Sequence, residues 1–128
     1  MLRDTKGPDM HIDKDLVAAS ATPLVLAILA EGESYGYGLL KRVRELSGGE
    51  LEWTDGMLYP LLHRLGRLGY VTTEWRPSPE GRRRRYCAIT DSGRAALAEQ
   101  QRQWTAVTRA LDGVWGGNFR LPAAFAEA

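Results

Sequence analysis

The sequence has little of what several classes of protein require. Its single cysteine, Cys87, excludes an intrachain disulfide framework and agrees with a reducing compartment. The longest apolar run, residues 23–30, is far too short to span a bilayer, and the N-terminus has no apolar signal core. We therefore expect a cytoplasmic protein of 128 residues, with one domain and a tail at each end, residues 1–12 (disordered) and 118–128.

Groups for catalysis are also scarce. The only histidines, His11 and His63, lie in unrelated segments, and neither has a Cys or His neighbour at metal-ligand spacing. Cys87 falls on the apolar face of an expected strand, where an inert buried thiol is usual. No glycine loop has the form of a phosphate loop, and no serine has a nucleophile-elbow context. We predict no enzyme activity, no metal and no cofactor.

Positive charge is concentrated in one part of a balanced chain. The formal net charge is only +1, yet residues 53–94 carry 8 basic and 4 acidic side chains, and residues 82–85 are four consecutive arginines. A local basic patch is the electrostatic feature of a protein that binds a polyanion. The alternative is a solvated charge run that only aids solubility.

Apolar periodicity predicts three short helices and one long one. The first spans residues 13–31, with Pro23 as a kink or a second start, and the next runs from a Ser34 cap to about Ser47. Thr54 caps the third, whose leucine stripe ends at Gly69. The last begins behind Thr90 and runs to about Trp115, which is roughly 37 Å.

Between the third and last helices the periodicity changes to two. Residues 70–75 and 84–89 predict the strands of a hairpin with a long loop. The order of helices and hairpin predicts a mostly α fold with a small β-hairpin, a winged helix-turn-helix over residues 13–89. Residues 90–117 then form a C-terminal dimerisation helix.

This arrangement assigns a DNA-binding face. The second helix of a helix-turn-helix pair enters the major groove, and the hairpin contacts the backbone. We expect two or three of the four arginines to reach DNA, and Arg85 to be structural because it shares a face with Cys87 and Ile89. The expected DNA-binding residues are Thr54, Gly56, Tyr59, His63, Arg64, Arg67, Arg82, Arg83 and Arg84. Tyr59 could instead pack on the hairpin, and His63 could be an ordinary exposed or packed imidazole.

The last helix is too long for so small a domain to cover. Its apolar residues recur at heptad spacing, which predicts a homodimer in which the first helix of one subunit packs across this stripe of the other. The expected dimerisation residues include Leu16, Leu97 and Val114.

Several motifs together resemble the PadR-type transcriptional regulators: "YGYGLLKRVRELSGGELE", "TDGMLYPLLHRLGRLGYV" and "EGRRRRYCAITDSGRAAL". The resemblance covers roughly residues 13–115 and is closest to the compact subclass with a single long C-terminal helix. It implies a homodimeric repressor of an inverted-repeat operator, released by a small planar aromatic or drug-like compound. Trp104 stands where some compact members stack such ligands at the dimer centre, and Val107 and Leu111 would line that site. Alternatively, Trp104 only fills the interface.

A different class of function also fits the sequence. A winged-helix module could dock on protein or RNA without binding an operator. The basic hairpin and the exposed face of the third helix favour the DNA-binding regulator, because a module that has lost operator binding has no need of four arginines there.

Overall fold

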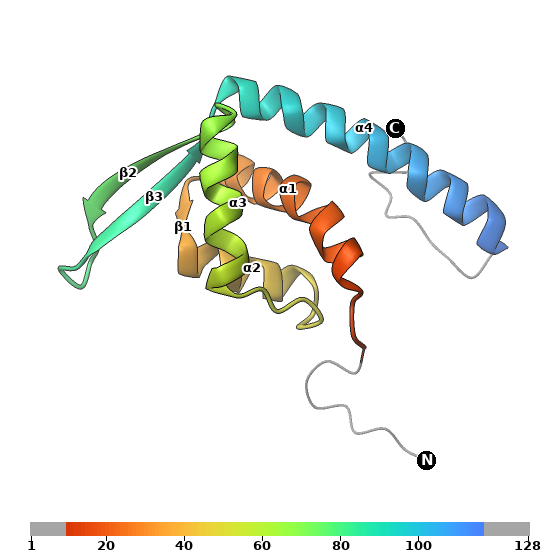
Figure 1. Ribbon diagram of the computed structural model, residues 1–128, viewed down its shortest axis with the longest axis horizontal. Helices are drawn as coiled ribbons and strands as arrows, with labels where there is room; N and C mark the ends of the chain where they lie inside the picture. The colour runs from red at the N-terminus through yellow and green to blue at the C-terminus, as the bar shows by residue number, and fades with distance from the viewer. Residues whose placement is uncertain (1–9, 117–128) are drawn as a thin grey trace, which may run out of the picture.

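The computed structural model describes residues 10–116; the tail predicted at 118–128 lies outside the described residues, as does most of the N-terminal one. Within this described part, four helices and three short strands follow one another (Figure 1). They are α1 (Lys14–Glu31), β1 (Ser34–Tyr35), α2 (Gly36–Leu46), α3 (Asp55–Arg67), β2 (Val71–Pro77), β3 (Arg83–Ile89) and α4 (Asp91–Trp115).

The three short helices enclose one apolar core. Its most buried side chains come from α1, α2 and α3, and the sheet and the start of α4 close it: Val25, Leu26, Leu29, Leu39, Val43, Leu58, Leu65, Val71, Cys87 and Leu97. The predicted leucine stripe of α3 is confirmed for Leu58, Leu61, Leu62 and Leu65, which are all buried, whereas its last member, Leu68, is the C-cap and is 51% exposed.

Local capping signals set the helix starts. The Thr54 hydroxyl accepts a hydrogen bond from the Met57 N–H at 3.3 Å, as the predicted N-cap of α3 should. Thr90 caps α4 in the same way, and its hydroxyl also donates to the Gly69 carbonyl at 2.7 Å. Pro23 lies inside α1, which continues as a single helix through it.

The sheet differs from the predicted two-stranded hairpin. Ser34 and Tyr35 form a third strand opposite Cys87 and Tyr86, so the strand order is β1–β3–β2. The prediction that Ser34 caps the second helix is therefore wrong: its backbone pairs with β3, and α2 begins at Gly36. The strands are also longer than predicted, so that only residues 78–82 make the turn. The name wing is used below for β2, β3 and this turn.

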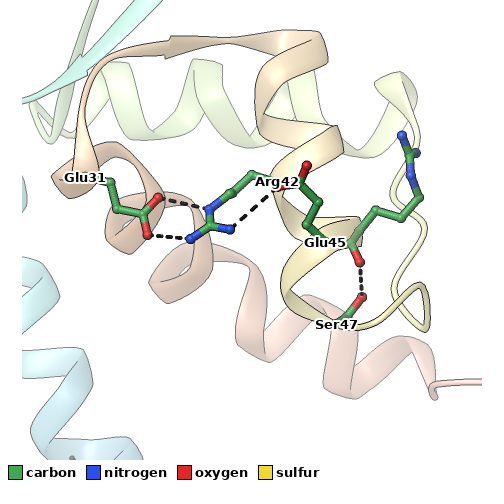
Figure 2. A network of polar contacts seen from close by, with 5 residues as sticks. Glu31, Arg42, Glu45 and Ser47 are labelled. Atoms are coloured by element: carbon green, nitrogen blue, oxygen red, sulfur yellow. Dashed lines mark hydrogen bonds and ion pairs between the residues drawn. The ribbon is translucent and has the colours of Figure 1, made fainter.

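A polar network joins α1 to α2 (Figure 2). Arg42 on α2 donates to both carboxylate oxygens of Glu31 at the end of α1, at 3.1 and 2.9 Å, and lies 3.6 Å from Glu45. This hydrogen bonding holds the pKa of Glu31 below its ordinary value. The pair links the end of α1 to α2 at the surface, outside the apolar core that the helices share.

Helix α4 extends from the sheet over α1, and its second half projects beyond the other helices (Figure 1). No helix in residues 10–116 is long and apolar enough to cross a membrane.

Candidate nucleic-acid interface

One face of α3 is exposed beside the wing. The leucine stripe of α3 faces the core, so Tyr59, His63 and Arg67 are left on the opposite, exposed side. Gly56 in the first turn is exposed too, and a Cβ there would meet nothing closer than 3.8 Å. The N-terminal turn of α3 is therefore open to a close approach by an anionic ligand.

A groove of about 630 Å³ runs between α3 and the wing. From α3 it is lined by Tyr59, His63 and Arg67, and from the sheet by Thr73 and Arg85. Arg85 donates to the Thr73 hydroxyl at 3.1 Å and remains exposed. Sequence reasoning assigned Arg85 a structural role because it shares a face with Cys87. The structure shows that this face of β3 turns toward α3. Arg85 lies on the part of the face that lines the groove.

A second hollow, of about 770 Å³, lies between the start of α2 and the tip of the wing. It shares Gly36, Tyr59 and Arg85 with the groove, so the two hollows form one continuous concave surface. Its members are mostly aromatic or basic: Tyr35, Tyr37, Tyr59, Trp75, Arg82, Arg83, Arg84 and Arg85. We call these eight residues, together with His63 and Arg67 from the groove, the basic–aromatic surface.

Arg84 differs from the other arginines of the run. Its guanidinium lies 4.1 Å from the ring centroid of Tyr35 and 2.9 Å from the carboxylate of Glu80, and it donates to the Tyr86 hydroxyl at 3.4 Å. The side chain is only 25% exposed. Arg84 therefore braces the wing against β1.

Arg82 and Arg83 are exposed, at the turn and at the start of β3. Arg83 lies over the exposed ring of Trp75, with 5.7 Å from guanidinium carbon to ring centroid. Arginine stacked on an aromatic ring keeps its planar donors available at the edge for phosphate oxygens.

Arg64 lies apart from the groove. Its guanidinium donates to the Thr22 hydroxyl of α1 at 3.4 Å, on the flank of α3 that turns away from the wing. Of the predicted α3 residues, the structure brings Tyr59, His63 and Arg67 together and leaves Arg64 at the edge.

The residues predicted for dimerisation and ligand binding lie on α1 and α4. Leu16, Val107 and Val114 are exposed, at 54, 51 and 83%, whereas Trp104 and Leu111 are partly buried. Leu97 is already buried in the chain's own core, so its burial needs no partner.

Sequence reasoning did not assign Tyr35, Tyr37, Trp75 and Arg85 of the basic–aromatic surface to DNA binding, nor Gly36 between the two hollows. The string "YGYG" at residues 35–38 was the signal for Tyr35, Gly36 and Tyr37, since aromatic side chains alternate there with glycines. Only the pairing of β1 with β3 places that string beside the wing. Within residues 10–116, no three His, Cys, Asp or Glu side chains gather where a metal ion could bind.

Three helices, a wing and a concave surface rich in arginine and tyrosine define a winged helix-turn-helix protein of the DNA-binding class. Comparison with known proteins gives the family. The chain belongs to the transcriptional regulator PadR-like family, whose family model matches residues 25–99. Regulators of this family bind DNA and are not enzymes.

Individual relatives agree with this assignment. The transcriptional regulator Rv3488 of Mycobacterium tuberculosis is 37% identical over 89 residues, which is 70% of this chain and 79% of the relative. A PadR family regulator of Eggerthella lenta is 28% identical, with a TM-score of 0.69 over 82% of this chain and 89% of that one. A PadR-like regulator of Bacillus cereus is 25% identical, with a TM-score of 0.71 over 81% and 99%.

Proposed function

We propose that this PadR-like regulator is a cytoplasmic, nucleoid-associated homodimeric repressor that binds an inverted-repeat operator through the basic–aromatic surface. In this proposal α3 enters the major groove, with Tyr59 and His63 toward base edges and Arg67 toward the backbone. Arg82, Arg83 and Arg85 follow the phosphates along the wing. The observation that carries the proposal is the continuity of the two hollows across α3, the start of α2 and the wing.

The experiment that tests this proposal is the salt dependence of duplex binding. A dimer that neutralises about 3–4 phosphates per subunit should give a slope of log K against log salt near −5 to −7. The duplex can be the DNA just upstream of the coding region, or one selected from a random library. A slope shallower than about −2, equal on selected and random DNA, would instead support an interaction module without operator binding.

Charge-matched variants then locate the contact. Arg83→Ala removes one phosphate contact from each subunit, so the slope should become shallower by about 2. Arg102→Ala removes the same charge from α4, where Arg102 pairs with Glu99, and should leave the slope unchanged. An equal change in both variants would remove the wing from the binding site.

The second part of the proposal is that a planar aromatic ligand binds at the dimer centre and releases the operator. Trp104, Val107 and Leu111 recur along one side of α4, and the partner's α4 would supply a second tryptophan ring. Stacking between two rings contributes on the order of 0.5–1.5 kcal/mol per ring beyond burial of area, which is consistent with affinity in about the micromolar range. Such a ligand relieves repression only if it binds the non-operator spacing of the subunits better.

Tryptophan fluorescence tests this part. Titration with Hoechst or ethidium should quench the tryptophan emission of the wild type and of Trp75→Phe, a control on the wing. In Trp104→Ala this quenching should be lost. Light scattering should show that the Trp104→Ala variant is still a dimer. Dye affinity that is undiminished in that variant would leave Trp104 a purely structural residue.

A further inference from the structure

Gly36 is buried at the first position of α2, at the junction of the two hollows. Its φ is not in the left-handed region, so the backbone does not require glycine there. Glycine is also a poor helix former. A reason for glycine at this position must therefore come from what lies against it.

The hydroxyl end of Tyr59 lies against Gly36. A Cβ added at Gly36 would overlap the Tyr59 hydroxyl oxygen and lie 3.0 Å from Cζ and 3.6 Å from Cε1. Any side chain at position 36 would meet the ring, because contacts below 3.0 Å do not occur with real Cβ atoms. By contrast, Gly66 on α3 and Gly113 on α4 have nothing within 4 Å of an added Cβ.

Tyr59 has little freedom to yield on the protein side. The neighbouring residues Leu58 and Leu62 are 0 and 5% exposed, so the backbone of α3 is fixed against the core. The Tyr59 ring itself is 49% exposed, with Gly36 on one side and the two hollows on the other. A side chain at position 36 would therefore rotate the ring outward into the concave surface.

We propose that Gly36 is a positioning residue for DNA recognition: it leaves the space in which the Tyr59 hydroxyl is held, and so sets how far the ring projects toward the duplex. This inference rests on the proposed DNA-binding function. It also makes position 36 a determinant of sequence preference, although Gly36 has no side chain to contact a base. A ring that is displaced into the groove would change fit at the bases that α3 reads more than attraction to the backbone.

A double-mutant cycle tests the inference with the full-length protein. Affinity is measured by fluorescence anisotropy on a duplex selected by the wild type from a random library, and on an unselected duplex. Gly36→Ala should weaken binding to the selected duplex by about tenfold or more and to the unselected one by about twofold or less. Gly113→Ala, a helix glycine with open space around it, should leave both affinities unchanged.

Tyr59→Phe supplies the rescue because it removes the oxygen that an added methyl group would overlap. In the Tyr59→Phe background, Gly36→Ala should cost no more than about threefold on the selected duplex. The same coupling should appear in thermal unfolding without DNA, where the loss caused by Gly36→Ala shrinks in the Phe background. If Gly36→Ala prevents folding, recovery of a folded Gly36→Ala/Tyr59→Phe protein supports the inference, and its failure to recover overturns it.

Equal losses for Gly36→Ala in both backgrounds would overturn the inference, because Gly36 would then act without Tyr59. So would losses of the same size on selected and unselected DNA. Failure of the proposed function looks different: the wild type would enrich no duplex from the library at all, and the inference would fall with it.

Discussion

At the scale of single residues, four adjacent arginines have different environments. Alternation along β3 turns Arg83 and Arg85 toward the face that contains the groove, and Arg84 toward Tyr35 and Tyr86. Charge count alone therefore overstates how many of them can meet a phosphate. Arg84 has an aromatic ring, a carboxylate and a hydroxyl as partners within the chain.

The bracing role of Arg84 can be separated from its charge. Arg84→Lys keeps the charge but loses the planar stacking on Tyr35, so the free energy of unfolding should fall by about 1 kcal/mol. Arg82→Lys, at the exposed turn, should change it by less than about 0.5 kcal/mol. Urea unfolding of the two variants measures the difference, and equal midpoints would show that the contacts of Arg84 add no stability.

Gly93 is a second residue at which a close approach demands glycine. An added Cβ would overlap the Tyr70 carbonyl oxygen and lie 2.8 Å from Cγ1 of Ile89. We expect Gly93→Ala to destabilise the protein by about 1–3 kcal/mol, although alanine is the better helix former. Gly66→Ala has open space and should instead stabilise α3 by up to about 1 kcal/mol. Chemical denaturation of the two variants measures their free energies of unfolding. A Gly93→Ala protein as stable as Gly66→Ala would contradict the expectation.

At the scale of elements, short polar contacts link the helices to their neighbours at the edge of the core. Thr90 joins the start of α4 to the turn that follows α3, through its hydroxyl and through its N–H, which donates to the Tyr70 carbonyl at 3.0 Å. Arg42 joins α2 to the end of α1 (Figure 2). The Thr90 contacts hold the start of α4 against the turn after α3. The Arg42 contact holds α2, which carries part of the basic–aromatic surface, against α1.

The Glu31–Arg42 pair should make stability depend on pH. The Arg42 guanidinium, mainly through its hydrogen bonds, lowers the pKa of Glu31 in the folded state from the ordinary 4.5. Its contribution is therefore fully present above about pH 4.5 and is lost as pH falls through the lower folded value. Glu31→Gln should lower the melting temperature slightly at pH 7, and the difference should shrink as the pH falls below about 4.5. A difference that grew on acidification would contradict this sign.

At the scale of the whole molecule, the second half of α4 projects beyond the other helices of the described residues (Figure 1). It runs for 25 residues, and its buried residues, Gly93, Leu97 and Thr105, lie in the first two thirds. Val107 and Val114 follow at heptad spacing from one another and are exposed. Leu16 of α1 is also exposed, so the other described residues leave these three apolar side chains uncovered, and we expect a second chain to bury them.

We expect light scattering to give a dimer mass at a protein concentration of about 10 µM, because dimerisation depends on protomer concentration. Val107→Glu places a charge in the expected interface and should weaken dimerisation by about 100-fold or more. Gln101→Glu adds the same charge at an exposed position of α4 and should remain dimeric. The far-UV circular dichroism of both variants should match the wild type. A wild-type protein with monomer mass would remove α4 as the interface.

The sequence by itself determined the helices and most of their ends, the start of α2 excepted. The leucine spacing of α3, the Thr54 and Thr90 caps and the change of period at residue 70 are short-range signals, which depend on neighbours a few residues away. The motifs of the family are local strings too, and they were sufficient to indicate a winged helix-turn-helix regulator.

Only the tertiary structure decided which residues share a surface. Three contacts join segments far apart in the chain: the pairing of β1 with β3, the bond from Arg64 to α1 and the contact of Gly36 with Tyr59. The opposite roles of Arg84 and Arg85 follow from what such contacts place on each face of β3. Alternation along a strand shows that two side chains point to opposite faces, but not which face the core and the helices will cover. That choice depends on how the helices pack, and packing is a property of the whole chain.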